Sequence, residues 1–258
     1  MSKYVTSFKN VGASYDESLL LLNELNKRSW NEIEAATHEE NLLKKRSSKW
    51  IEMLLRTAWR RYFESHAPLP EVKDLTRFLL KINSRQAKIQ TLFQYICASH
   101  PLVDHCVIDL VGVNLKQYGT FRLTKTIFRD FFSEEAKVHS ELEAWADYTK
   151  DKWRRDFFAF LRSSSLMESH PNVFVKNFVI KPETFAFFLY GLLENRIITS
   201  ELFNAKIWKR YFLTYEDIEE KLSECQVRGW LKYRSRGGIH ELIPKFKNLE
   251  MWINAIKS

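Results

Sequence analysis

One candidate binding surface lies on a predicted helix over residues 49–65, where three cations recur at helical spacing. Arg56 and Arg60 follow Lys49 by seven and eleven positions, so all three fall on one side of the helix. Side chains in such a row can bind the phosphate groups of a nucleic acid. Glu52 lies on the same side and weakens the row. The alternative is the ordinary solvated face of an amphipathic helix.

A second row lies on the predicted helix over residues 150–163, for which Thr149 is the predicted cap. It consists of Lys152, Arg155 and Arg162, with Tyr148 one turn earlier. The positions that must face the core are Trp153, Phe157, Phe160 and Leu161. As the third helix of a helix-turn-helix unit, this segment would enter the major groove, where an arginine can bind O6 and N7 of guanine. Asp151 and Asp156 favour a plain solvated face instead.

The third candidate is a basic hairpin near the C-terminus. Residues 230–233 and 239–243 are predicted strands on either side of the turn Arg234-Ser-Arg-Gly-Gly238. The cations that alternate here, and so project from one face, are Lys232, Arg234 and Arg236. They can contact phosphates, or they can be a charged edge that blocks aggregation. The preceding helix, residues 215–227, is acidic and would be repelled by a duplex, which leaves the hairpin or a protein contact.

No catalytic or metal-binding motif accompanies these cations. The sequence has no Gly-rich phosphate loop, no G-x-S-x-G and no H-E-x-x-H. The nearest approach to a zinc site is Cys97-x-x-His100 followed by His105-Cys106, and Pro101 interrupts it. We therefore expect no enzyme, no cofactor and no metal.

The elements that position these cations are predicted to be mainly helical. Only 7 glycines and 6 prolines occur among 258 residues, which favours helices. An N-terminal helical domain is expected over residues 1–100. Residues 101–180 and 181–258 each indicate three helices and a small β-hairpin, the layout of two tandem winged-helix-like units. With 40 Lys+Arg against 32 Asp+Glu, the net charge of +8 favours a polyanionic partner.

Several residues are predicted to start helices or to form strands. The predicted helix caps are Ser29 with Glu32 as a capping box, Ser47 or Ser48, Thr124 and Thr214. Pro182 is predicted in a first helical turn, and Ser200 is predicted to open the second helix of the last unit. The alternating, β-branched segment 172–180 predicts a strand.

The sequence also predicts a cytoplasmic protein. The best apolar stretch, residues 184–193, is about half the length that a membrane span needs. The N-terminus lacks the apolar region of a signal peptide. Three scattered cysteines fit a reducing compartment.

Several segments resemble the BrxA family of BREX (bacteriophage exclusion) defence islands of bacteria. They are KYVTSFKNVGASYDESLLLLNEL, HPLVDHCVIDLVGVNLKQYG, LTKTIFRDFF, AKVHSELEAW and TKDKWRRDFFAFLRSSSL, and the resemblance covers about residues 4–166. It implies a small accessory protein of a phage-resistance system that marks host DNA by methylation. The family has also been likened to the RNA-binding protein NusB. Members have been described as membrane proteins, and the composition contradicts this second description.

Together these features predict a non-enzymatic component of a BREX system that binds double-stranded DNA mainly through phosphates. Two alternatives stay open. One is NusB-like RNA binding. The other is an adaptor that binds other BREX proteins and has no affinity for nucleic acid.

Overall fold

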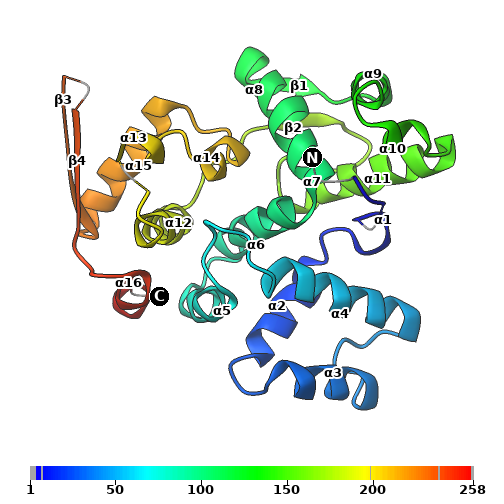
Figure 1. The fold of residues 1–258 in the computed structure, drawn as a ribbon, viewed down its shortest axis with the longest axis horizontal. Coiled ribbons are helices and arrows are strands. Elements are labelled where there is room, and N and C mark those ends of the chain that lie inside the picture. Colours follow the sequence, from blue (N-terminus) through cyan, green and yellow to red (C-terminus); the bar gives the residue numbers. More distant parts are fainter. Residues whose placement is uncertain (1–3, 7, 198, 238, 257–258) are drawn as a thin grey trace.

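The computed structural model describes residues 4–6, 8–197, 199–237 and 239–256. It is mainly helical with two small antiparallel sheets, as the sequence predicts (Figure 1). One cluster of buried apolar side chains runs through all three predicted parts. The division into three domains therefore stays a prediction.

The N-terminal part is helical, as expected. Its helices are α1 (Phe8–Val11), α2 (Tyr15–Glu24), α3 (Trp30–Glu39), α4 (Ser48–Tyr62), α5 (Val72–Lys81) and α6 (Arg85–Ser99). The capping box before α3 is confirmed, because the Ser29 side chain accepts from the Glu32 amide and the Glu32 carboxylate accepts from the Ser29 amide. Ser47, rather than Ser48, caps α4.

The middle part begins with a helical rod and continues into further helices and two short strands. The rod comprises α7 (Pro101–His105), the π-helical η1 (Cys106–Gly112) and α8 (Val113–Tyr118), and it is followed by β1 (Thr120–Arg122), α9 (Lys125–Ala136), α10 (Ser140–Glu143), α11 (Asp147–Ser163) and β2 (Phe174–Lys176). Thr124 caps α9 as predicted. The cap predicted at Thr149 is wrong, because α11 begins at Asp147, three residues before the predicted start, and Ala146 is at the cap position.

The strand predicted over residues 172–180 is shorter than expected. Only Phe174–Lys176 is strand, and it pairs antiparallel with β1, with Val175 opposite Phe121. On its other side Val175 bridges Met167. The pattern of alternating residues continues past Lys176, but no strand in the described part of the chain pairs with the backbone of residues 177–180.

The described residues of the last part form four helices, a hairpin and a C-terminal helix, in that order. Its elements are α12 (Pro182–Glu194), α13 (Thr199–Leu202), α14 (Lys206–Arg210), α15 (Tyr215–Val227), β3 (Leu231–Arg236), β4 (Ile239–Pro244) and α16 (Leu249–Ala255). Pro182 lies in the first turn of α12 and Thr214 caps α15, as predicted. The single helix expected after Ser200 is instead two short helices, α13 and α14.

A buried ion network joins the middle and last parts across α6, which Figure 1 shows between them. Asp104 accepts from Arg210 through both oxygens, at 2.7 Å from Nε and 3.3 Å from the terminal nitrogen. Lys206 adds a contact of 2.6 Å to the same carboxylate. Arg210 also donates to Gln94 of α6 at 3.2 Å. One carboxylate thus fixes α14 against α6 and α7.

A second buried cluster ties the N-terminal segment to α4. Arg61 is fully buried and donates to the carbonyl oxygens of Gly12 and Ala13, so its charge is met by peptide dipoles. The ring of His100 lies between Arg61, at 3.3 Å, and Arg60, at 2.7 Å. Burial and these two guanidinium groups hold the pKa of His100 well below its usual value.

Asp104→Asn is expected to destabilise the fold by about 3–5 kcal/mol, because it leaves Arg210 buried without a counter-charge. Urea unfolding measures the change. Glu134→Gln is the control, since its ion pair with Lys137 is exposed and is worth about 1 kcal/mol or less. Equal losses in the two variants would contradict the role assigned to the network.

The His100 environment predicts that the fold weakens below neutral pH. The folded state keeps His100 neutral, whereas the unfolded chain takes up a proton below about pH 6.5. Below about pH 6.5, each further unit of acidification therefore lowers the free energy of unfolding by about 1.4 kcal/mol through this group. In urea titrations at neutral pH and one unit below pH 6.5, His100→Gln should lose less stability than the wild type. Parallel losses would remove His100 as the cause.

Candidate nucleic-acid interface

The β3–β4 hairpin presents the three predicted cations on one face. Lys232, Arg234 and Arg236 are exposed, and among the described residues none of them makes an ion pair. Glu241 lies opposite Arg234 in the strand register but forms no ion pair with it. These three residues, called the hairpin cations below, are available for a partner's phosphate groups.

The other face of the hairpin is fixed to α15. Tyr233 is buried, its amide donates to Gln226 at 2.6 Å, and its hydroxyl donates to Glu219 at 2.8 Å. Burial and the nearby Glu219 carboxylate raise the pKa of Tyr233, so it stays neutral. His240 of β4 lies 2.8 Å from the same hydroxyl. The hairpin cations therefore project from a base that α15 holds in place.

The row on α11 is largely occupied by groups of the same chain. Lys152 pairs with Asp156 at 3.2 Å, and Arg155 pairs with Asp151 at 3.3 Å. Arg162 donates to the carbonyl oxygens of Glu168 and Asn172, both at 3.2 Å, and so holds the turn before β2. These side chains lie outside the core, as their helical spacing predicts. That spacing could not predict that Arg162 binds the turn before β2.

The row on α4 is shorter than predicted. Lys49 and Arg56 are exposed and have no ion pair within the described part of the chain. Arg60 is not part of an exposed row, because its guanidinium turns inward to His100 and burial lowers its pKa. The helical wheel predicts the side of α4 on which Arg60 lies, but not its contact with His100, the residue between α6 and α7.

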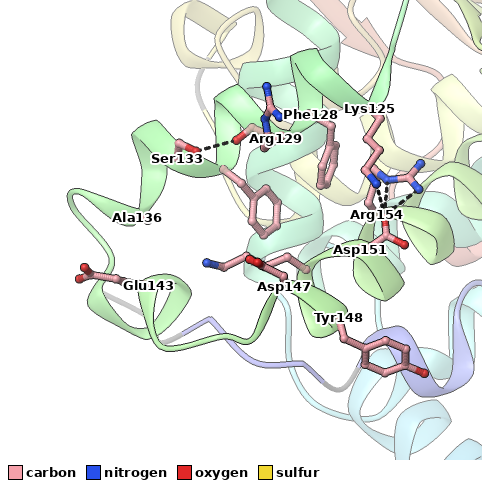
Figure 2. A pocket seen from close by; sticks show the side chains of 12 residues that line it. Lys125, Phe128, Arg129, Ser133, Ala136, Glu143, Asp147, Tyr148, Asp151 and Arg154 are labelled. Carbon is pink, nitrogen blue, oxygen red and sulfur yellow. Dashed lines mark hydrogen bonds and ion pairs between the residues drawn. The ribbon is translucent and has the colours of Figure 1, made fainter.

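A cleft between α9 and α11 contains cations that the sequence analysis missed. It has a volume of about 750 Å³ and is walled by Phe128 and Phe132 (Figure 2). Its cations are Lys125, Arg129, Lys150 and Arg154, and its carboxylates are Glu143, Asp147 and Asp151. The signal that could have found them is the i, i+4 spacing of Lys125 and Arg129 directly after the Thr124 cap.

The outer face of the β1–β2 sheet adds two more exposed cations. Arg122 lies over the ring of Phe174, 5.5 Å from its centre, and Lys176 is the next exposed residue along β2. Neither makes an ion pair among the described residues. β1 and β2 have three residues each, and an alternating pattern of that length is too short to predict this face from the sequence.

The surface of α15 is acidic, as predicted, because Glu216 and Glu220 are exposed.

Groups of histidine, cysteine and carboxylate side chains able to hold a metal are absent from the described residues. In the same residues, no single helix is long and apolar enough to cross a membrane; the segments Arg85–Ser99 and Pro101–Tyr118 meet that criterion only together, across a bend of 115°.

Comparisons with known proteins show the fold and the family. No curated protein matches this chain. The crystal structure of an uncharacterized protein from Magnetospirillum magneticum is similar, with a TM-score of 0.63 and 15% identity over 81% of this chain and 98% of that chain. At that identity the likeness shows the fold alone. The family model of BrxA matches residues 2–189, and the chain therefore belongs to the BrxA family.

Proposed function

We propose that this chain is a non-enzymatic, double-stranded DNA-binding component of a BREX phage-defence system. Membership of the BrxA family indicates a BREX component, with other BREX proteins as partners. The DNA-binding part of the proposal rests on the hairpin cations, because they lie next to one another on one exposed face and make no ion pair among the described residues.

The order of elements supports two winged-helix-like units. Residues 101–176 run from α7, η1 and α8 through β1, α9, α10 and α11 to β2, which pairs with β1. The Leu166 carbonyl, just after α11, accepts from the Lys176 amide at 2.9 Å. Residues 182–244 run as helices followed by the β3–β4 hairpin. In such units the helix pair and the hairpin, or wing, form the surface that meets a duplex.

The distribution of charge makes the second wing the principal contact. The hairpin cations make no ion pair with any described residue, whereas the acidic α15 beside them would be repelled by a phosphate backbone. Phosphate contacts position a protein without reading sequence. Binding is therefore expected to be steeply salt-dependent and weakly sequence-selective.

A second candidate is the assembly adaptor, which the exposed carboxylates of α15 favour. An adaptor would hold a basic surface of another BREX protein and would show no affinity for nucleic acid at physiological salt.

RNA binding is the third candidate function. A competition between duplex DNA and structured RNA separates it, because the deep, narrow major groove of A-form RNA excludes a recognition helix.

Arg234→Glu/Arg236→Glu is expected to weaken duplex binding roughly tenfold or more at about 0.1 M salt, because two phosphate contacts become repulsions. Fluorescence anisotropy with a labelled duplex, at several salt concentrations, measures affinity and its salt dependence. The wild-type slope of log K against log [salt] should be about −4 to −5 for some five contacts, and the variant should lose about two of these units.

Lys73→Glu/Lys81→Glu is the matched control, since both lysines are exposed on α5 and carry no ion pair in the described structure. It makes the same change in net charge away from the hairpin. An equal loss in both variants would show a general charge effect. No binding by the wild type at physiological salt would favour the adaptor.

A further inference from the structure

The Asp151 carboxylate collects more cations than it can neutralise. Arg154 approaches it at 2.9 Å, Arg155 at 3.3 Å and Lys125 at 3.5 Å. Lys125 comes from α9 and the two arginines come from α11, so two helices converge on one anion. The Asp151 cluster, defined as these four residues, keeps two formal positive charges beyond the one that Asp151 cancels.

The cluster is open on its outer side and fixed on its inner side. The side chain of Arg154 is only 17% exposed, and its guanidinium lies over Phe158, 5.1 Å from the ring centre. Lys125 and Arg155 are 73% and 56% exposed, so an incoming group can reach them. Figure 2 shows Lys125 and Arg154 directed at Asp151, with Glu143 at the far end of the cleft.

A carboxylate and a phosphodiester present similar groups to these cations. Each offers two oxygens that share one negative charge, and an arginine fork binds either through paired N–H donors. The three cations also lie where α9 and α11 form the helix pair of the first unit. Lys125 is the first residue of α9, whose N-terminus adds a positive dipole.

We propose that Asp151 occupies a phosphate-binding site, and that a backbone phosphate of bound DNA displaces it from Lys125, Arg154 and Arg155. This inference rests on the proposed function. Asp151 then acts as an internal competitor that lowers the affinity of the first unit for DNA. The displaced carboxylate stays at the surface, where it is one-third exposed and can take up water.

Asp151→Asn should tighten duplex binding about two- to fivefold, the range that an exposed ion pair is worth. The slope of log K against log [salt] should stay close to the wild-type value, because the wild type neutralises the same phosphate once Asp151 has moved aside. Anisotropy titration with the labelled duplex gives both values. Adding Lys125→Gln/Arg155→Gln to Asp151→Asn should abolish the gain.

Asp16→Asn is the matched control, because it removes the same charge and another exposed pair with an arginine, Arg85, on α2 and α6. It should leave the affinity unchanged. A similar gain in this control, or no gain in Asp151→Asn while the wild type binds the duplex through the hairpin cations, would overturn the inference alone. A wild type that binds no duplex would overturn the proposed function.

Thermal melting by circular dichroism shows whether Asp151→Asn folds. If it does not fold, the single variants Lys125→Gln and Arg155→Gln carry the test, since both side chains are mainly exposed. Each should weaken duplex binding by a similar factor. Unchanged affinity in both would overturn the inference.

Discussion

The placement of carboxylates among the cations determines where this molecule can bind a polyanion. A cation that already pairs with an acid of its own chain must exchange that acid for a phosphate, and the exchange returns little free energy. On α11, Lys152 and Arg155 pair with Asp156 and Asp151. The hairpin cations lack such partners in the described structure. The net charge of +8 therefore matters less than its local distribution.

The buried polar contacts of the core explain how this distribution is held in place. Asp104 connects α7 to Arg210 and Lys206 of α14, and Gln94 of α6 joins the same network. These contacts fix the last part, and with it the base of the hairpin, against the middle part. A loss of Asp104 would thus alter the relation between the two candidate DNA-binding units as well as the stability of the fold.

Features set by neighbouring residues could be predicted from the sequence, and features set by distant ones could not. The Ser29 capping box, the Thr124 and Thr214 caps and the β3–β4 hairpin each depend on a few consecutive residues, and the structure confirms them. Arg60 and Arg162 lie on the expected sides of their helices. Their partners, His100 and the turn before β2, come from other segments, so helical spacing could not reveal that they are occupied.

Covalent labelling of arginine and lysine side chains, with and without saturating duplex DNA and read by mass spectrometry, tests whether the hairpin cations contact the duplex. We expect the duplex to protect Lys232, Arg234 and Arg236 strongly, and the labelling of Lys73 and Lys81 on α5 to stay unchanged. Labelling of the hairpin cations that is the same with and without DNA, while the duplex is bound, would contradict this contact.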